Sequence, residues 1–189
     1  STAITSFKYQ TEHGEVSLSI EDIKTLLCPK ATEIEAAIFL RKCYHQQLNP
    51  FLGEAYLIKY DEKAPAQMVV GKDTFTQRAE RSPQFDGLRA GLIVKAQQGT
   101  LEIEGSFATD DQVILGAWAE VYRKDRSKPF RMTVSMKEYN KGYSNWTKMP
   151  NTMIRKVALV QALREAFPSA FVGLYDEAEI LEGDLMPLQ

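Results

Sequence analysis

The sequence is short of cysteine, histidine and long apolar runs, and each shortage excludes a class of protein. Two cysteines in 189 residues cannot form a disulfide framework, and no CxxC pair occurs. His13 and His45 stand apart, so no metal-ligand pair or nucleophile–base arrangement is recognisable. No stretch approaches the roughly 18 apolar residues of a membrane span. We therefore expect a cytoplasmic protein with reduced thiols, no membrane partner, no metal site and no cofactor.

Catalytic motifs are also missing. The segment "VVGKDTF" looks like a phosphate loop, but a Walker A motif needs Gly five positions before the Gly-Lys pair and Ser or Thr directly after it. Ala66 and Asp73 occupy those positions. Acids cluster at 110–111 and in "DEAE" at 176–179, where solvated surface acids are the simpler interpretation. We expect no catalytic residues, and a metal-dependent nuclease is the least favoured alternative.

The positive charge is concentrated in one part of the chain. The net charge is only −2, but residues 122–164 hold 11 Lys and Arg against 2 acids, a balance of +9. The other residues sum to −11. Such asymmetry is typical of a polyanion site on an acidic body, although an ordinary solvated basic face has the same composition.

Sequence patterns predict an α+β fold, with an antiparallel β-meander packed against helices in a single domain over residues 1–189. Thr32 and Glu35 form a capping-box pattern at the start of a helix that Asn49-Pro50 ends. Helical patterns cover 16–27, 32–48, 73–81, 151 or 152 to 167 and a short acidic piece at 176–181, and Ser17 or Ser19 is the expected cap of the first. Strand patterns cover 55–60, 66–70, 92–96, 100–107, 112–122 and 130–136.

The last two strand segments flank "RKDRSKP" and predict a hairpin with a basic tip. Its second arm alternates between two faces. Phe130, Met132, Val134 and Met136 are expected to face the core. Arg131, Thr133, Ser135 and Lys137 would then line the other face and be available for phosphate contacts.

The stretch "NWTKMPNTMIRK" at 145–156 carries no acid and combines cations with one aromatic side chain. Single-strand binding needs phosphate donors and flat platforms for unpaired bases. Trp146, Tyr143 and Met153 supply the platforms, while the cations nearby are Lys137, Lys141, Lys148, Arg155 and Lys156. Core packing of Trp146 is the alternative.

The helix over 151–167 is largely apolar around its circumference, so we expect it to be mostly buried. Met153, Val157, Val160 and Arg164 share one face, which would suit a groove floor. The helix N-terminus would offer N–H groups to phosphate. Alternatively, Met153 packs in the core and Arg164 neutralises a buried acid.

Several blocks together resemble the RecT/Bet (lambda Beta-like) family of phage single-strand annealing recombination proteins. These are "LNPF", "YRKDR", Trp146 with Pro150 four positions later, "MIRKVALVQALREAF" and "GLYDEAE". Their order and spacing match the family from about residue 31 to 180.

The resemblance implies ATP-independent annealing of complementary DNA within a ring or helical filament, in the cytoplasm of a bacterial host. It also implies a Rad52-like core, a partner 5′→3′ exonuclease and a host single-strand-binding protein. The C-terminal region that would bind these two partners is expected to be absent, and a Mg²⁺ requirement stays open. A passive single-strand binder is the main alternative function.

Motif positions of the family fall on Trp146, Met153, Arg155 and Arg164, while Lys156 and Val157 depart from the family pattern. Together with the basic composition, this predicts a DNA-binding set. The set is Lys72, Arg123, Lys124, Arg126, Lys137, Lys141, Tyr143, Trp146, Lys148, Met153, Arg155, Lys156 and Arg164.

Overall fold

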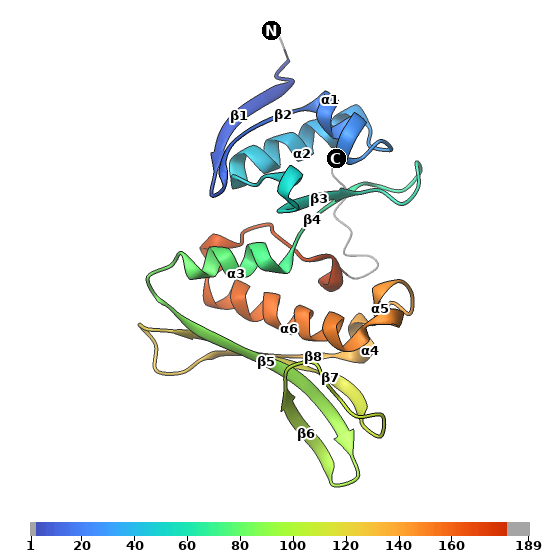
Figure 1. Cartoon of the computed structure of the whole chain (residues 1–189), viewed down its shortest axis with the longest axis vertical. Helices are drawn as coiled ribbons and strands as arrows, with labels where there is room; N and C mark the ends of the chain where they lie inside the picture. Colours follow the sequence, from blue (N-terminus) through green and yellow to red (C-terminus); the bar gives the residue numbers. More distant parts are fainter. Residues whose placement is uncertain (1–2, 181–189) are drawn as a thin grey trace. The chain divides into compact units, whose positions relative to one another are not determined.

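The computed structural model describes residues 3–180 and has the mixed α+β composition expected from the sequence (Figure 1). The chain divides into two compact units. The first comprises residues 3–71 and the second residues 72–180 of the described chain. Each has its own antiparallel pairing of strands and its own buried side chains.

The first unit opens with a hairpin of β1 (Ser6–Thr11) and β2 (Gly14–Ser19). The expected helix over 16–27 is therefore wrong for its first four residues. Val16 and Leu18 are buried while Ser17 is exposed, and this alternation suits a paired strand better than a helix. Helix α1 (Ile20–Asp22) follows and continues into the π-helical turn η1 (Ile23–Leu27). Ser19 caps it with a capping box, as one of the two predicted caps.

Helix α2 (Glu33–Gln46) begins at the predicted cap, because the Thr32 side chain accepts from Glu35 N and the Glu35 side chain accepts from Thr32 N. It ends at Gln47, whose φ of 55° lies in the left-handed region. The short helix η2 (Pro50–Leu52) then leads into a hairpin of β3 (Ala55–Ile58) and β4 (Gln67–Val70).

A buried ion pair joins α2 to the β3–β4 hairpin. Glu35 Oε1 lies 2.6 Å from Lys59 Nζ, and both side chains are under 10% exposed. Glu35 Oε2 also accepts from Ala66 N at 2.5 Å. Burial alone would raise the pKa of Glu35, but the Lys59 ammonium and the N–H groups of Thr32 and Ala66 lower it to about 2.

The second unit begins with α3 (Lys72–Glu80) and contains a four-stranded antiparallel sheet. Its strands are β5 (Phe85–Ala96), β6 (Gly99–Glu104), β7 (Val113–Arg123) and β8 (Phe130–Ser135). The order β6-β5-β7-β8 corrects the expected meander, because β7 pairs with β5 rather than with β6. The long β5 is central and rich in buried residues, whereas the short β6 carries exposed glutamates that suit an edge strand.

Helix α6 (Pro150–Ala166) packs on one face of this sheet and contacts α3 on its other side (Figure 1). It buries nine side chains, so the expectation of a mostly buried helix is confirmed. On β7 the residues facing this core include Ala117, Ala119 and Val121, and the two alanines allow close approach of the helix. Two short helices precede α6, namely α4 (Met136–Tyr139) and α5 (Asn145–Lys148). The turns η3 (Pro168–Ala170) and η4 (Glu177–Glu179) follow it.

We predict that Glu35→Gln destabilises the protein by about 3 kcal/mol at neutral pH, because Lys59 would be left buried without a counter-charge. The folded pKa of about 2 lies below the ordinary value of 4.5, so the ion pair contributes fully above that value. Its contribution is lost as the pH falls from about 4.5 towards 2.

The measurement is urea unfolding of the wild type and the variant between neutral pH and pH 2. The stability difference should shrink across the acidic part of that range. Glu33→Gln, at an exposed position in the same helical turn, is the control and should behave as the wild type does. A constant difference between Glu35→Gln and wild type would contradict the assignment.

Candidate nucleic-acid interface

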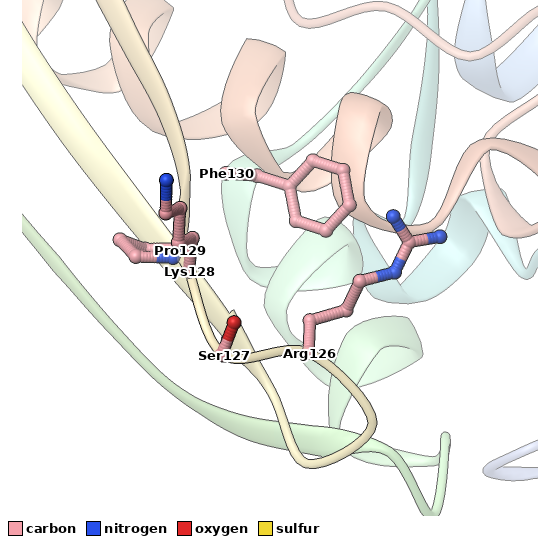
Figure 2. Close-up of a pocket in the computed structure, with 5 residues that line it drawn as sticks. All are labelled: Arg126, Ser127, Lys128, Pro129 and Phe130. Carbon is pink, nitrogen blue, oxygen red and sulfur yellow. The ribbon is translucent and has the colours of Figure 1, made fainter.

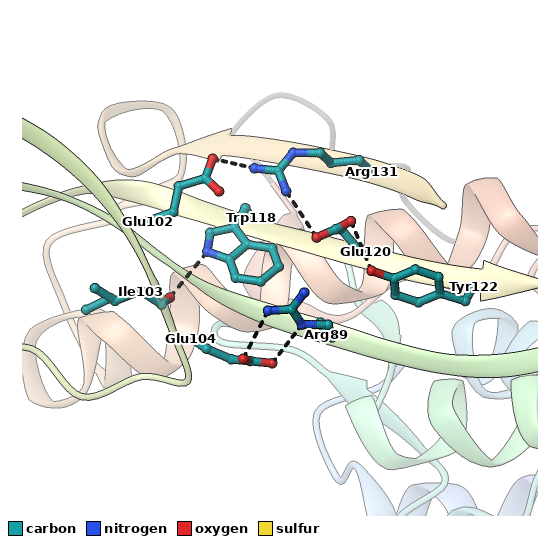
Figure 3. Close-up of polar contacts among 8 residues, drawn as sticks. All are labelled: Arg89, Glu102, Ile103, Glu104, Trp118, Glu120, Tyr122 and Arg131. Atoms are coloured by element: carbon teal, nitrogen blue, oxygen red, sulfur yellow. Dashed lines mark hydrogen bonds and ion pairs between the residues drawn. The ribbon is translucent and has the colours of Figure 1, made fainter. Parts of the chain in front are cut away.

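The sheet face opposite α6 carries a ladder of ion pairs around Trp118 (Figure 3). Arg89 donates to both carboxylate oxygens of Glu104, at 3.1 and 3.2 Å. Arg131 bonds Glu102 and, at 3.3 Å, Glu120. Both guanidinium groups lie over the Trp118 ring, 5.6 and 5.2 Å from its centroid. The positive charges of Arg89 and Arg131 are therefore neutralised within the chain.

Trp118 occupies this face because Gly91, its partner on β5, has no side chain. A Cβ on Gly91 would lie 1.8 Å from the Ile103 carbonyl oxygen and 2.8 Å from Trp118 Nε1. That nitrogen instead donates to the Ile103 carbonyl at 3.2 Å, which ties β7 to the edge strand β6. The ring is only 4% exposed and is unavailable for stacking with a base.

The predicted alternation along β8 is confirmed from Phe130 to Ser135, with Val134 buried and Arg131 and Thr133 exposed. Met136 and Lys137 lie beyond the strand, in α4. The expectation that Arg131 is available to phosphate needs correction, because Glu102 and Glu120 already pair with it. Sequence alone gave no signal for this, since Glu102 lies 29 residues away.

A first group of exposed cations lies in residues 136–149, which we call the α4–α5 segment. Lys137 and Lys148 are exposed, and neither forms an ion pair with another described residue. Tyr143 is 60% exposed and Met149 is 45% exposed. Lys141 is partly covered and donates to the Glu177 carbonyl at 3.2 Å, and burial lowers its pKa. This segment thus presents charge and an aromatic ring together.

Trp146 anchors the α4–α5 segment and does not present an open stacking platform. It is 3% exposed, within a short helix that packs on the start of α6. The core-packing alternative therefore describes its side chain. Its Nε1 is buried without a hydrogen-bond partner among the described residues. Met153 is likewise buried at 5% exposure.

The cations of α6 are largely occupied within the chain. Arg155 Nε donates to the Ala90 carbonyl at 3.4 Å. Lys156 lies 3.2 Å from the buried carboxylate of Asp176. Arg164 pairs with the buried Glu179 and donates to the Leu174 carbonyl at 2.9 Å. The expected groove floor is thus corrected: Met153, Val157 and Val160 are buried, and Arg164 neutralises an acid.

A second group of exposed cations lies at the β7–β8 turn, residues 124–129, which we call the hairpin tip (Figure 2). Lys124, Arg126 and Lys128 are exposed, and none forms an ion pair with another described residue. Arg123 is different, because it is held by Asp125 and by the Ala166 carbonyl. An open hollow of about 280 Å³ lies here, lined by Arg126, Ser127, Lys128, Pro129 and Phe130.

The two groups lie at opposite ends of the β7–β8 hairpin, because β8 runs from the hairpin tip towards α4. The strand between them, β8, has six residues and spans roughly 20 Å. Lys72 belongs to neither group and lies at the start of α3, 3.9 Å from Asp73. The exposed predicted cations that form no ion pair with a described residue therefore lie on two surfaces of the chain.

Comparisons with known proteins identify the family. The model of the RecT family matches residues 14–186. The chain belongs to the RecT family. It is 28% identical over 142 residues to the recombination protein bet of Escherichia phage lambda, covering 70% of this chain and 46% of that protein. It is also 28% identical over 158 residues to an uncharacterised protein of Ureaplasma parvum, covering 81% of this chain and 64% of that protein. The chain thus spans about half to two thirds of the length of these relatives.

Two further properties of this RecT-family chain bear on its chemistry. Within the described residues, no three His, Cys, Asp or Glu side chains gather closely enough to hold a metal ion. None of the helices in residues 3–180 is both long enough and apolar enough for a membrane crossing.

We predict that Arg164→Gln destabilises the RecT-family fold by about 3 kcal/mol, because it leaves the Glu179 carboxylate buried without its partner. Arg126→Gln, at an exposed cation with no such partner, should change the stability by less than about 0.5 kcal/mol. Chemical denaturation of both variants measures this. Equal, small changes would mean that Arg164 is a free surface cation.

Proposed function

We propose that this RecT-family protein anneals complementary single-stranded DNA without ATP and works as an oligomer. The observation that carries the proposal is the α4–α5 segment, where cations without an ion pair to any described residue and an exposed aromatic ring lie beside the start of α6. Lys137 and Lys148 supply charge for phosphates, and Tyr143 supplies a face for a base. Helix α6 begins at Pro150 with no side-chain cap, which favours an anion at its N-terminus.

The predicted DNA-binding residues take different parts in this proposal. Lys124, Arg126, Lys137, Tyr143 and Lys148 are exposed and would touch DNA directly. Trp146, Met153 and Arg164 would act by holding α5 and α6 in place. Arg155, Lys156, Lys141, Arg123 and Lys72 have partners within the chain, so they would contribute mainly to the electrostatic potential.

Annealing needs more than retention of a strand. A protein that holds phosphates and leaves base edges open lets a second strand test its complementarity, since base pairing carries the sequence information. We propose a Rad52-like core for this task, with both compact units in one annealing module. The similarity to a phage recombination protein supports this over passive binding. A metal-dependent nuclease has less support, because the described acids form no metal-binding cluster.

We further propose a cytoplasmic site of action in a bacterial host, together with a 5′→3′ exonuclease and a host single-strand-binding protein. These partners follow from the family resemblance, and we assign no described residue to either. No covalent chemistry is required for pairing, so we infer that the protein is not an enzyme. A role of Mg²⁺ in screening the annealed duplex is open to direct test.

The deciding experiment is a time course of duplex formation from two complementary fluorescent oligonucleotides, with and without protein and without nucleotide triphosphate. We expect pairing to accelerate with protein concentration up to saturation of the strands. A protein that binds both strands but leaves the rate unchanged is a passive binder. Degradation of the strands on addition of Mg²⁺ would instead indicate the nuclease.

We predict that the double variant Lys137→Gln/Lys148→Gln weakens single-strand binding and annealing. Loss of two phosphate contacts should reduce the magnitude of the slope of log affinity against log salt by about 1.4, since single strands contribute roughly 0.7 for each contact. Lys63→Gln, at an exposed cation in the first unit, is the control and should retain the wild-type slope. An unchanged slope in the double variant would remove the α4–α5 segment from the binding site.

A further inference from the structure

The loop between β6 and β7, residues 105–112, carries a large apolar side chain that is exposed to solvent. Phe107 is 80% exposed. Asp110 and Asp111 follow it, both exposed, and neither forms an ion pair with another described residue. Aromatic side chains are enriched at the centres of protein–protein contacts, and charged residues lie at their rims.

The loop is held in a defined conformation. Gly105 N donates to the Ala90 carbonyl at 3.0 Å, which fixes its start. Thr109 N donates to Gln112 Oε1 and Gln112 N donates to the Thr109 carbonyl, each at 3.0 Å, which closes its end. Asn151 Nδ2 donates to the Ser106 carbonyl at 3.3 Å, which ties the loop to the start of α6. Phe107 is therefore presented by an ordered support, so little entropy is lost on docking.

The hairpin tip at the other end of β7 has the complementary properties. Its hollow combines an apolar lining from Pro129 and Phe130 with the charges of Arg126 and Lys128 (Figure 2). The Arg126 guanidinium lies 5.3 Å from the Phe130 ring centroid, which leaves the ring at the wall of the hollow. A cavity of about 150 Å³ already holds benzene, so a hollow of about 280 Å³ has room for the ring of a phenylalanine.

We propose that Phe107 of one copy docks into the hairpin tip of a second copy, with Asp110 and Asp111 facing Lys124, Arg126 and Lys128. The inference rests on the oligomeric protein proposed above and names the surfaces that would join its subunits. The loop and the hairpin tip lie at opposite ends of β7 and cannot meet within one chain. Such a contact is head-to-tail, and repeated use of it builds a ring if it closes and a filament if it does not.

This contact also explains how two separated groups of cations serve one DNA strand. The loop lies beside the start of α6, next to the α4–α5 segment. Docking would bring the hairpin tip of one copy alongside the α4–α5 segment of its neighbour. Asp110 and Asp111 would lie between these two basic surfaces and offset their mutual repulsion.

The test uses two charge reversals on the full chain, made separately and then mixed. The loop variant is Asp110→Lys/Asp111→Lys, and the tip variant is Arg126→Glu/Lys128→Glu. Each alone places like charges on both surfaces and should weaken self-association on the order of tenfold or more. An equimolar mixture restores opposite charges at every contact and should assemble again. Sedimentation velocity at low salt, without DNA and then with oligothymidylate, measures assembly.

Two further variants complete the design. Phe107→Ser should weaken assembly without changing net charge, and Asp61→Lys/Glu62→Lys reverses a matched pair of exposed acids elsewhere and should leave assembly unchanged. Circular dichroism confirms that each variant is folded. The proposal is overturned if the wild type stays monomeric under both conditions, if the single variants assemble normally, or if the mixture fails to recover.

The annealing assay keeps this proposal separate from the proposed function. If the wild type assembles through these surfaces but does not accelerate pairing, the proposed interface stands and the proposed annealing function is contradicted. If the wild type accelerates pairing as a monomer, the proposed annealing function stands and the proposed interface is contradicted. Tip reversal that weakens only DNA binding, with assembly intact, would make the hairpin tip a DNA contact and overturn the docking.

Discussion

The packing of α6 on the four-stranded sheet decides which cations the protein can offer to a ligand. Helix α6 buries nine side chains between the sheet and α3, so its polar residues are confined to the narrow strips of helix surface that remain. The cations at these positions pair with acids that follow α6 in the sequence, as in Lys156–Asp176 and Arg164–Glu179. These pairs hold the η4 turn against the helix, and they leave the exposed cations at the two ends of the β7–β8 hairpin.

On the opposite face of the sheet, arginines are likewise paired with acids of the same chain. Arg89 and Arg131 lie over Trp118 and pair with three glutamates, so the charges of these two guanidinium groups are balanced within the chain. A free arginine over an aromatic ring would be an attractive DNA contact. With carboxylates already bound to both guanidinium groups, a phosphate would have to displace a pre-formed ion pair. The ladder therefore favours a supporting role for this face over a binding role.

Local features of the sequence predicted local structure well. The Thr32–Glu35 capping box, the extent of α6 and the alternation along β8 were all readable, because each depends on residues a few positions apart. The strand order β6-β5-β7-β8 was not readable, since it depends on a long-range pairing that Gly91 permits beneath Trp118. The burial of Trp146 was weighed only as an alternative, because its polar, turn-rich neighbours gave no sign of the contact between α5 and α6.

The candidate site was predictable in composition but not in arrangement. A count of Lys and Arg cannot distinguish Lys148, which has no described counter-ion, from Lys156, whose partner Asp176 lies 20 residues further along the chain. Of the described acids that pair with cations of residues 122–164, all except Asp125 come from outside this window. The count of Lys and Arg within the window therefore overstates the positive charge that a polyanion would meet. The predicted cations that remain without a described ion-pair partner lie mainly on two surfaces, at opposite ends of the β7–β8 hairpin. In the docking proposed above, the hairpin tip of one subunit would lie alongside the α4–α5 segment of the next, so a strand of DNA would gain a continuous basic path through assembly.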